Sequence, residues 1–354
     1  MALIDTSLGK INELLSFAAE QHASDLHFLV GKPPILRIDG ILRELDDQDV
    51  LTPLILEKMV FSILSKEQQN RFIKERELDF SYGIKDVARY RVNIHWEKEN
   101  IGLVARVVNQ KIPTMEDVNM PPVVYNLARL KQGLIMMTGP TGCGKSTSLA
   151  AIIDLLNKER NAHIITLEDP IEFVFTSNKS YIRQRQFNDD FLSFADALKH
   201  IVRQDPNIIM VGEMRDLETI AAAITLAETG HLVLATLHTP NAAQTIDRII
   251  DVFPPHQQDQ IRLQLSMTLR GVIAQQLVPK LDGGRIAARE ILINTPAVSN
   301  LIRENKIPQI KSVIQTNLEM GMIPLEHALE KLYEKKIISE DTLKIYTNRL
   351  EGIS

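Results

Sequence analysis

The sequence contains little cysteine and no long apolar run. Its only cysteine is Cys143, so an internal disulfide and a four-cysteine zinc site are both excluded. No stretch reaches the roughly eighteen uninterrupted apolar residues that suggest a membrane-spanning helix, and the first residues lack the basic flank and apolar core of a secretory signal. We therefore expect a protein of the reducing cytoplasm that contacts membranes only peripherally.

An excess of positive charge is also missing. Lys and Arg number 40 against 45 Asp and Glu, which gives a formal net charge of -5 at pH 7. This balance provides no global attraction to nucleic acid or to anionic lipid. Hydrophobic residues make up 44% and charged residues 24%, which is typical of a folded globular protein.

Chain length and apolar spacing predict two domains. A chain of 354 residues is long enough for two separate cores. We predict that residues 1–108 form a small α+β domain and that residues 109–122, which include three prolines, form a linker. The predicted helices of the first domain span residues 11–22 and 54–74, and its predicted strands span residues 25–29, 35–38, 41–43, 89–94 and 101–108.

The second predicted domain covers residues 123–354. Its short apolar runs alternate with helical segments, which predicts an α/β fold with a mostly parallel sheet flanked by helices. The predicted strands cover residues 134–137, 164–167, 208–211 and 232–237, and the predicted helices of a C-terminal tail cover residues 291–306, 310–317, 325–335 and 341–350.

Residues 139–147 read Gly-Pro-Thr-Gly-Cys-Gly-Lys-Ser-Thr and form a complete phosphate-loop motif. An apolar strand precedes the motif and a helical run follows it, as the motif requires. Its glycines allow the backbone to curl so that amides face phosphate oxygens, while Lys145 neutralises phosphate charge and the Ser146 hydroxyl ligates Mg²⁺. The predicted nucleotide-binding residues are Thr141, Gly142, Cys143, Gly144, Lys145, Ser146 and Thr147, with ATP and Mg²⁺ as cofactors.

Two further apolar strands end in acids. Residues 208–211 lead to Glu213, which we predict orients the attacking water; the alternative is a solvated acid at a strand end. Residues 164–167 lead to Glu168 and Asp169. Glu168 is a candidate ligand for Mg²⁺ or its water shell. The alternative for this strand end is that Asp169 caps the next segment.

A histidine and several arginines complete the candidate site. His238 follows the strand at 232–237 and is either a γ-phosphate sensor or a structural histidine. Arg203, Arg215 and Arg248 lie near these segments. Ring-forming ATPases complete a site with arginines from another domain or subunit, although surface arginines are also common for other reasons.

Four ordered sequence boxes resemble those of the type IV pilus retraction ATPases, a family within the type II/IV secretion superfamily. They are the phosphate loop, an Asp box at residues 165–173, a Walker B stretch at 205–216 and a His box at 230–239. Residues 23–27, 31–34 and 245–254 extend the likeness over nearly the whole chain.

The resemblance implies a PAS-like first domain and a RecA-like ATPase domain, assembled as a homohexamer that works on an inner-membrane pilus platform protein. It implies that Glu213 is the catalytic acid and that Glu168, Glu172, His231 and His238 lie near phosphate and metal. Arg203 and Arg248 fall on positions associated with the active site or a subunit interface. Arg89, Arg91 and Arg106 are possible sources of arginine from the first domain.

Two residues depart from the family pattern. Ser299 stands where retraction ATPases typically have the arginine of an Ala-Ile-Arg-Asn-Leu-Ile motif, and Cys143 stands where serine is more usual. The competing hypotheses are a pilus assembly or type II secretion ATPase and a nucleic-acid translocase. The acidic balance and the lack of a basic-aromatic strand argue against the translocase.

Overall fold

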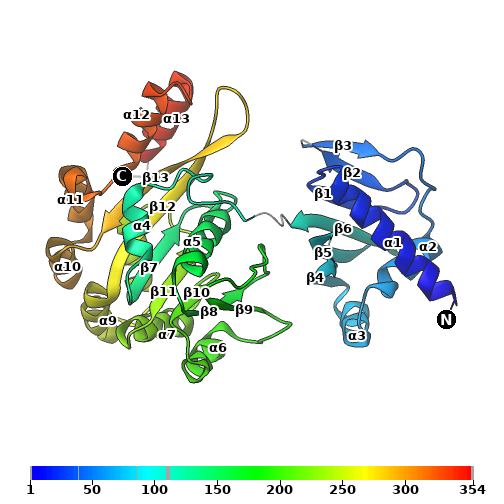
Figure 1. The fold of residues 1–354 in the computed structure, drawn as a ribbon, viewed down its shortest axis with the longest axis horizontal. Coiled ribbons are helices and arrows are strands. Elements are labelled where there is room, and N and C mark those ends of the chain that lie inside the picture. Colours follow the sequence, from blue (N-terminus) through cyan, green and yellow to red (C-terminus); the bar gives the residue numbers. More distant parts are fainter. Residues whose placement is uncertain (1, 39, 86, 109–111, 352–354) are drawn as a thin grey trace. The chain divides into compact units, whose positions relative to one another are not determined.

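The computed structural model describes residues 2–38, 40–85, 87–108 and 112–351. The chain divides into two compact units, which are drawn in Figure 1. One comprises Met1–Lys111 with Pro170–Phe173, and the other comprises Ile112–Asp169 with Val174–Ser354. The start of the predicted linker, residues 109–111, lies outside the described residues.

The first unit is an antiparallel sheet with helices packed against it. Its six strands run in the order β3-β2-β1-β6-β5-β4, and every neighbouring pair is antiparallel. Helix α1 buries Ile11, Leu14 and Leu15 in a core with strand residues such as Leu26 and Val92. The strands are β1 (Asp25–Phe28), β2 (Ile35–Ile38), β3 (Ile41–Glu44), β4 (Glu77–Ile84), β5 (Ala88–Glu97) and β6 (Asn100–Val108), and the helices are α1 (Ala2–Glu20), α2 (Pro53–Ser62) and α3 (Lys66–Glu75).

The prediction of one helix over residues 54–74 is wrong, because two helices occupy this segment. Ser65 begins the second one with a capping box, in which its hydroxyl accepts from the Gln68 amide and the Gln68 side chain accepts from the Ser65 amide. Apolar spacing continues across the break and hides it. Strand β4 was not predicted at all.

The second unit contains a seven-stranded sheet in the order β13-β12-β7-β11-β10-β8-β9. All neighbours are parallel except the β12–β13 pair. The phosphate-loop strand β7 lies between β11 and β12, so β11 separates it from β10, which leads to Glu213. The strands are β7 (Gly133–Thr138), β8 (His163–Glu168), β9 (Tyr181–Gln186), β10 (Ile208–Val211), β11 (Leu232–Leu237), β12 (Leu269–Pro279) and β13 (Arg285–Ile293).

Helices cover both faces of this sheet, as Figure 1 shows. On β7, Leu134 and Met136 face a core shared with α7, α8 and α9, while Ile135 and Met137 face a core shared with α4 and α5. Burial on both faces accounts for the continuous apolar runs of the central strands. The helices are α4 (Pro122–Ala128), α5 (Lys145–Glu159), α6 (Phe194–Ile201), α7 (Leu217–Glu228), α8 (Ala242–Asp251), α9 (Pro255–Thr268), α10 (Pro296–Arg303), α11 (Ile310–Thr316), α12 (Leu325–Glu334) and α13 (Glu340–Glu351), with short 3₁₀ helices at Val202–Gln204, Ile307–Gln309 and Leu318–Met320.

The predicted helix over residues 291–306 is also wrong in its first part. Strand β13 continues to Ile293, because residues 285–293 pair with β12 along their whole length. Thr295 then caps α10 by accepting a hydrogen bond from the Val298 amide, and Pro296 occupies the first turn. The other three predicted tail helices correspond to α11, α12 and α13.

Tyr90 provides a test of how α1 is fixed to the first sheet. Its side chain is fully buried, and its hydroxyl donates to the Leu15 carbonyl at 2.8 Å. Tyr90→Phe removes the hydrogen bond that ties the sheet to this helix carbonyl, so we expect the free energy of unfolding, measured by urea denaturation, to fall by about 1 to 2 kcal/mol. Tyr82→Phe is the matched control, because Tyr82 and its partner Asn12 are only partly buried and water can replace the lost bond. Equal losses in the two variants would contradict this account.

Candidate active site

The loop between β7 and α5 has a backbone that only glycine adopts readily. Gly139, Gly142 and Gly144 have φ values of 138°, 75° and 84°. A β-carbon at Gly139 would lie 2.2 Å from the Gln275 carbonyl oxygen, which is far inside van der Waals contact. Helix α5 begins at Lys145, so its free amides and positive dipole end point into this loop. This geometry suits an anion such as phosphate.

Lys145 is directed back into the loop. Its ammonium group donates to the Gly139 carbonyl at 2.7 Å and the Pro140 carbonyl at 3.1 Å, and it lies 3.3 Å from Nδ1 of His238. The side chain is 9% exposed. A positive charge is therefore held at the mouth of the loop, where it can neutralise phosphate.

The remaining predicted loop residues differ in exposure. Thr141 and Gly142 are exposed, Gly144, Ser146 and Thr147 are half-buried, and Cys143 is buried. Burial raises the pKa of the Cys143 thiol above its ordinary value, despite the opposing charge of Lys145. Ser146 is half-buried on the first turn of α5, whereas the cysteine is buried.

Glu213 follows β10 and lies between two basic groups. Its carboxylate is 2.7 Å from Arg215 and 3.3 Å from Nε2 of His238. Burial raises the pKa of Glu213, but the hydrogen bond and charge of Arg215, together with His238 and Lys145, outweigh burial and hold the pKa below its ordinary value. Glu213 is therefore ionised at neutral pH.

Gly212, which precedes this acid, allows β10 to approach β8 closely. Its amide donates to the Leu167 carbonyl at 2.7 Å, and a β-carbon on it would lie 3.0 Å from the same carbonyl oxygen. Its own carbonyl accepts from the Thr236 hydroxyl on β11. A larger residue would require Leu167 or Gly212 to shift by a few tenths of an ångström.

These contacts join residues from four strand ends into one continuous cluster. Nδ1 of His238 lies near Lys145, and its Nε2 lies near Glu213. Arg215 binds Glu213 and also lies 3.8 Å from Asp169. The structure thus brings the predicted Lys145, Glu213 and His238 together at the carboxyl edge of the sheet, which is where parallel α/β sheets bind ligands.

Glu168 lies at the same edge but is engaged within the sheet. It is 6% exposed, and its carboxylate accepts from the Thr166 hydroxyl at 2.6 Å and from the Gln184 amide at 3.0 Å. A role for Glu168 as a metal ligand stays a prediction. Within the described residues, no group of three or more His, Cys, Asp or Glu side chains is arranged to hold a metal ion.

The other predicted residues of the second unit lie outside this cluster. Arg203 is exposed in the 3₁₀ helix that precedes β10, and Arg248 is exposed in the last turn of α8. His231 precedes β11 and so lies at the opposite end of that strand from His238; its Nδ1 is 3.0 Å from the Leu226 carbonyl. In the first unit, Arg106 forms an ion pair of 2.8 Å with Asp25.

Two buried polar residues next to the loop were missed. Gln275 on β12 and Arg289 on β13 are 1% and 3% exposed, and both lie within mostly apolar strands. A charged or amide side chain inside an apolar strand is the signal that could have identified them, because burial of such a group requires a polar partner.

Ser299 anchors α10 to the end of α9. Its hydroxyl donates to the Ser266 carbonyl at 2.9 Å and lies 3.1 Å from the Asn294 side-chain oxygen. The departure from the family motif therefore lies away from the phosphate loop. At this position a small hydroxyl stands where the motif has the long, positively charged side chain of arginine.

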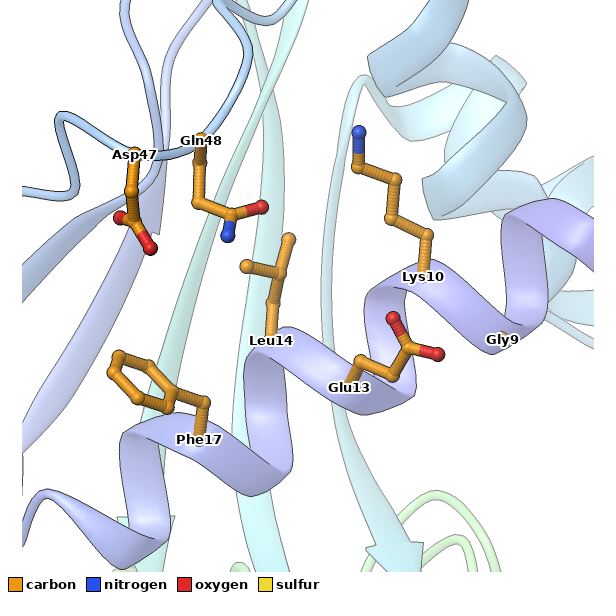
Figure 2. A pocket seen from close by; sticks show the side chains of 7 residues that line it. All are labelled: Gly9, Lys10, Glu13, Leu14, Phe17, Asp47 and Gln48. Carbon is orange, nitrogen blue, oxygen red and sulfur yellow. The ribbon is translucent and has the colours of Figure 1, made fainter.

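A separate hollow of about 580 Å³ lies on the first unit (Figure 2). Side chains from α1 and from the loop at Asp47 and Gln48 line it, with Lys10 and Glu13 of opposite charge on one helix turn. It has no glycine-rich loop and no helix N-terminus, so it differs in kind from the phosphate loop.

No helix in the described part of the chain is long and apolar enough to span a bilayer.

Comparison with known proteins places the chain in a family. Residues 7–319 match the family described as Type II/IV secretion system protein. The chain is 47% identical to the type IV pilus retraction ATPase PilT of Pseudomonas aeruginosa, over 94% of this chain and 97% of that protein. It is 43% identical to a twitching motility protein of Neisseria gonorrhoeae, over 91% of this chain and 86% of that protein.

A solved structure agrees with this match. The crystal structure of the pilus retraction motor PilT with bound ADP superimposes with a TM-score of 0.89 at 44% identity, over 94% of this chain and 95% of that one. The shared fold, the phosphate loop and the cluster around Glu213 all agree with membership of this family. The chain belongs to the type II/IV secretion system protein family.

Proposed function

We propose that this protein is an ATP-hydrolysing motor that powers retraction of type IV pili. The observation that carries the proposal is the contact between Lys145, His238 and Glu213, because it links a phosphate-binding loop to an ionised acid. Likeness to a retraction ATPase along almost the full length of both chains supports the same function.

The residues of the loop fit a nucleotide with Mg²⁺. The amides at the start of α5 and the glycines at 142 and 144 would bind the phosphates, and the Ser146 hydroxyl would bind the metal. The metal supplies charge neutralisation to the phosphates when it is bound. Lys145 already lies beside the loop carbonyls and would add a second positive charge.

Glu213 would orient the attacking water. An ionised carboxylate can accept a proton from water, and Arg215 and His238 fix its two oxygens from different sides. His238 also contacts Lys145 and Thr141, so its position would respond to whatever occupies the loop. This arrangement favours a role for His238 as a sensor of the terminal phosphate.

Assembly as a homohexamer would complete the site. Arg203 and Arg248 are exposed and make no hydrogen bond or ion pair within the part of the chain that is described, so they are available to a neighbouring subunit. An arginine supplied in this way is worth about 10³-fold or more in rate for related phosphate-transfer reactions. The ring would act at the cytoplasmic face of the inner membrane on a pilus platform protein.

The same ATPase activity could instead power pilus assembly or type II secretion. Retraction is favoured by the relatives that match along almost their full length. A nucleic-acid translocase is disfavoured by the net charge of -5. Ser299 is the residue that separates this chain from the usual retraction motif.

Two substitutions test the assignment of the loop and the acid. Lys145→Ala removes the charge at the loop and should abolish nucleotide binding or turnover. Glu213→Gln keeps the shape of the side chain but cannot accept a proton, so ATP hydrolysis should fall by about 10² or more while nucleotide binding remains. Phosphate release and equilibrium binding are the measurements. Wild-type turnover in Glu213→Gln would remove Glu213 from the mechanism.

The pH dependence of hydrolysis tests the environment of Glu213. Glu213 must be deprotonated to act, and its pKa is held below its ordinary value, so the rate should persist as the pH falls until that lowered pKa is approached. Arg215→Gln removes the largest interaction that lowers this pKa, so the acidic limb of the pH–rate profile should move to higher pH. Arg129→Gln breaks a surface pair with Glu159 and is the control. An unmoved limb in Arg215→Gln would contradict the assignment.

Deletion in a host with pili distinguishes retraction from assembly. Loss of a retraction motor should leave an excess of surface pili and abolish twitching, because fibres are built but not withdrawn. Loss of an assembly motor should leave none. Pili counted by electron microscopy, with the Glu213→Gln gene returned as the inactive control, provide the measurement; bare cells would overturn the retraction proposal.

A further inference from the structure

Arg289 is a buried cation whose partners are all neutral. Its guanidinium donates to the Gln275 side-chain oxygen at 2.7 Å, to the Ser148 hydroxyl at 3.1 Å and to the carbonyls of Asn119 and Val118 at 3.0 and 2.9 Å. Within the described residues, no carboxylate lies within ion-pair distance of it. Burial lowers its pKa to about 10, so it remains charged at neutral pH. A charge buried at this cost calls for a reason beyond packing.

Gln275 connects this cation to the phosphate loop. Its side-chain oxygen accepts from Arg289 and from the Ser148 hydroxyl at 2.8 Å, and its side-chain amide donates to the carbonyl of Cys143. Because Arg289 and Ser148 occupy the oxygen, the amide nitrogen is necessarily directed at the loop. The orientation of the Gln275 side chain is therefore set by Arg289 together with Ser148.

The loop also rests on Gln275 through close packing. Strand β12 pairs with β7 up to Ala274 opposite Thr138, so Gln275 comes next beside Gly139. A β-carbon at Gly139 would strike the Gln275 carbonyl at 2.2 Å, and one at Gly144 would lie 3.1 Å from its side-chain nitrogen. Both ends of the curled loop thus contact this one residue.

The bond to the Cys143 carbonyl bears on phosphate binding through peptide geometry. A trans peptide is planar, and its C=O and N–H point in opposite directions. When Gln275 holds the Cys143 carbonyl on the β12 side, the amide of Gly144 is directed to the other side, into the loop. A donor fixed in advance in this way binds an anion without a further ordering cost.

On its far side Arg289 binds a compact turn at residues 114–120. The Thr114 amide donates to the Asp117 carboxylate at 2.9 Å, and the Asp117 amide donates to the Thr114 hydroxyl at 3.1 Å. Met115 and Met120 of the turn are buried in the core. This turn comes soon after Ile112, where the second unit begins. Arg289 therefore contacts the segment that follows the chain's passage between the units.

We propose that Arg289 and Gln275 are positioning residues that fix the nucleotide loop through the Cys143 carbonyl and make its shape depend on the turn at residues 114–120. The inference rests on the proposed nucleotide binding and adds a route by which that turn affects affinity. Neither side chain touches the nucleotide in this scheme, so the effect is on affinity more than on the chemical step.

The first test removes the bond to the loop. Gln275→Leu should raise the dissociation constant of a fluorescent ADP analogue and the KM for ATP by about tenfold, the equivalent of one hydrogen bond, with kcat changed much less. Gln276→Leu is the matched control, because successive side chains of a strand face opposite sides and Gln276 lies outside the network. Equal affinities in Gln275→Leu and the wild type would overturn the proposal.

The second test removes Arg289, which acts on the loop only through Gln275 in this scheme. Arg289→Met should weaken the analogue to a similar extent, Arg289→Lys should restore only part of the affinity, and the Arg289→Met, Gln275→Leu double variant should be little weaker than either single one. Additive losses, or wild-type affinity in a folded Arg289→Met protein, would overturn the relay.

A third variant keeps the test decisive if Arg289→Met does not fold. Asp117→Ala loosens the exposed side of the turn without leaving a buried charge unpaired, and it should raise the dissociation constant by about threefold, less than loss of a whole hydrogen bond. Unchanged binding in this variant would separate the turn from the loop and overturn that part of the inference. A wild-type protein that binds no analogue would instead refute the proposed function, so the two failures are distinguishable.

Discussion

A loop that binds phosphate with its own peptide groups, as we propose for the loop between β7 and α5, requires a backbone conformation that most side chains forbid. Three glycines at positive φ make the curl possible, but they also remove the side chains that would otherwise hold the loop in shape. Part of the shape comes from Lys145, which donates to the Gly139 and Pro140 carbonyls. The rest comes from β12, whose Gln275 packs against both Gly139 and Gly144.

The electrostatic arrangement follows from the same strand order. Because β11 lies between β7 and β10, His238 at the end of β11 is placed between Lys145 and Glu213. A histidine can contact a cation through one ring nitrogen and an anion through the other, provided that the first nitrogen carries no proton. The sheet topology thus determines which residue lies between the loop and the acid.

Much of the second unit could be predicted from sequence, because its main signals are local. A glycine-rich loop between a strand and a helix, and acids directly after apolar strands, identify Lys145, Glu213 and their edge of the sheet. The break before α3 was also locally visible in the Ser65 and Gln68 spacing but was overridden by apolar periodicity. The roles of Gln275 and Arg289 could not be predicted, since they depend on which strands pair and on a turn more than 150 residues away in sequence.

The lone cysteine has a practical consequence. Thiol reagents attack the thiolate, and Cys143 is both 3% exposed and raised in pKa by burial. The native protein should therefore be nearly inert to maleimide dyes. A single cysteine introduced on an exposed surface of either unit would become the reactive position, so a fluorophore could be attached there without first altering the phosphate loop.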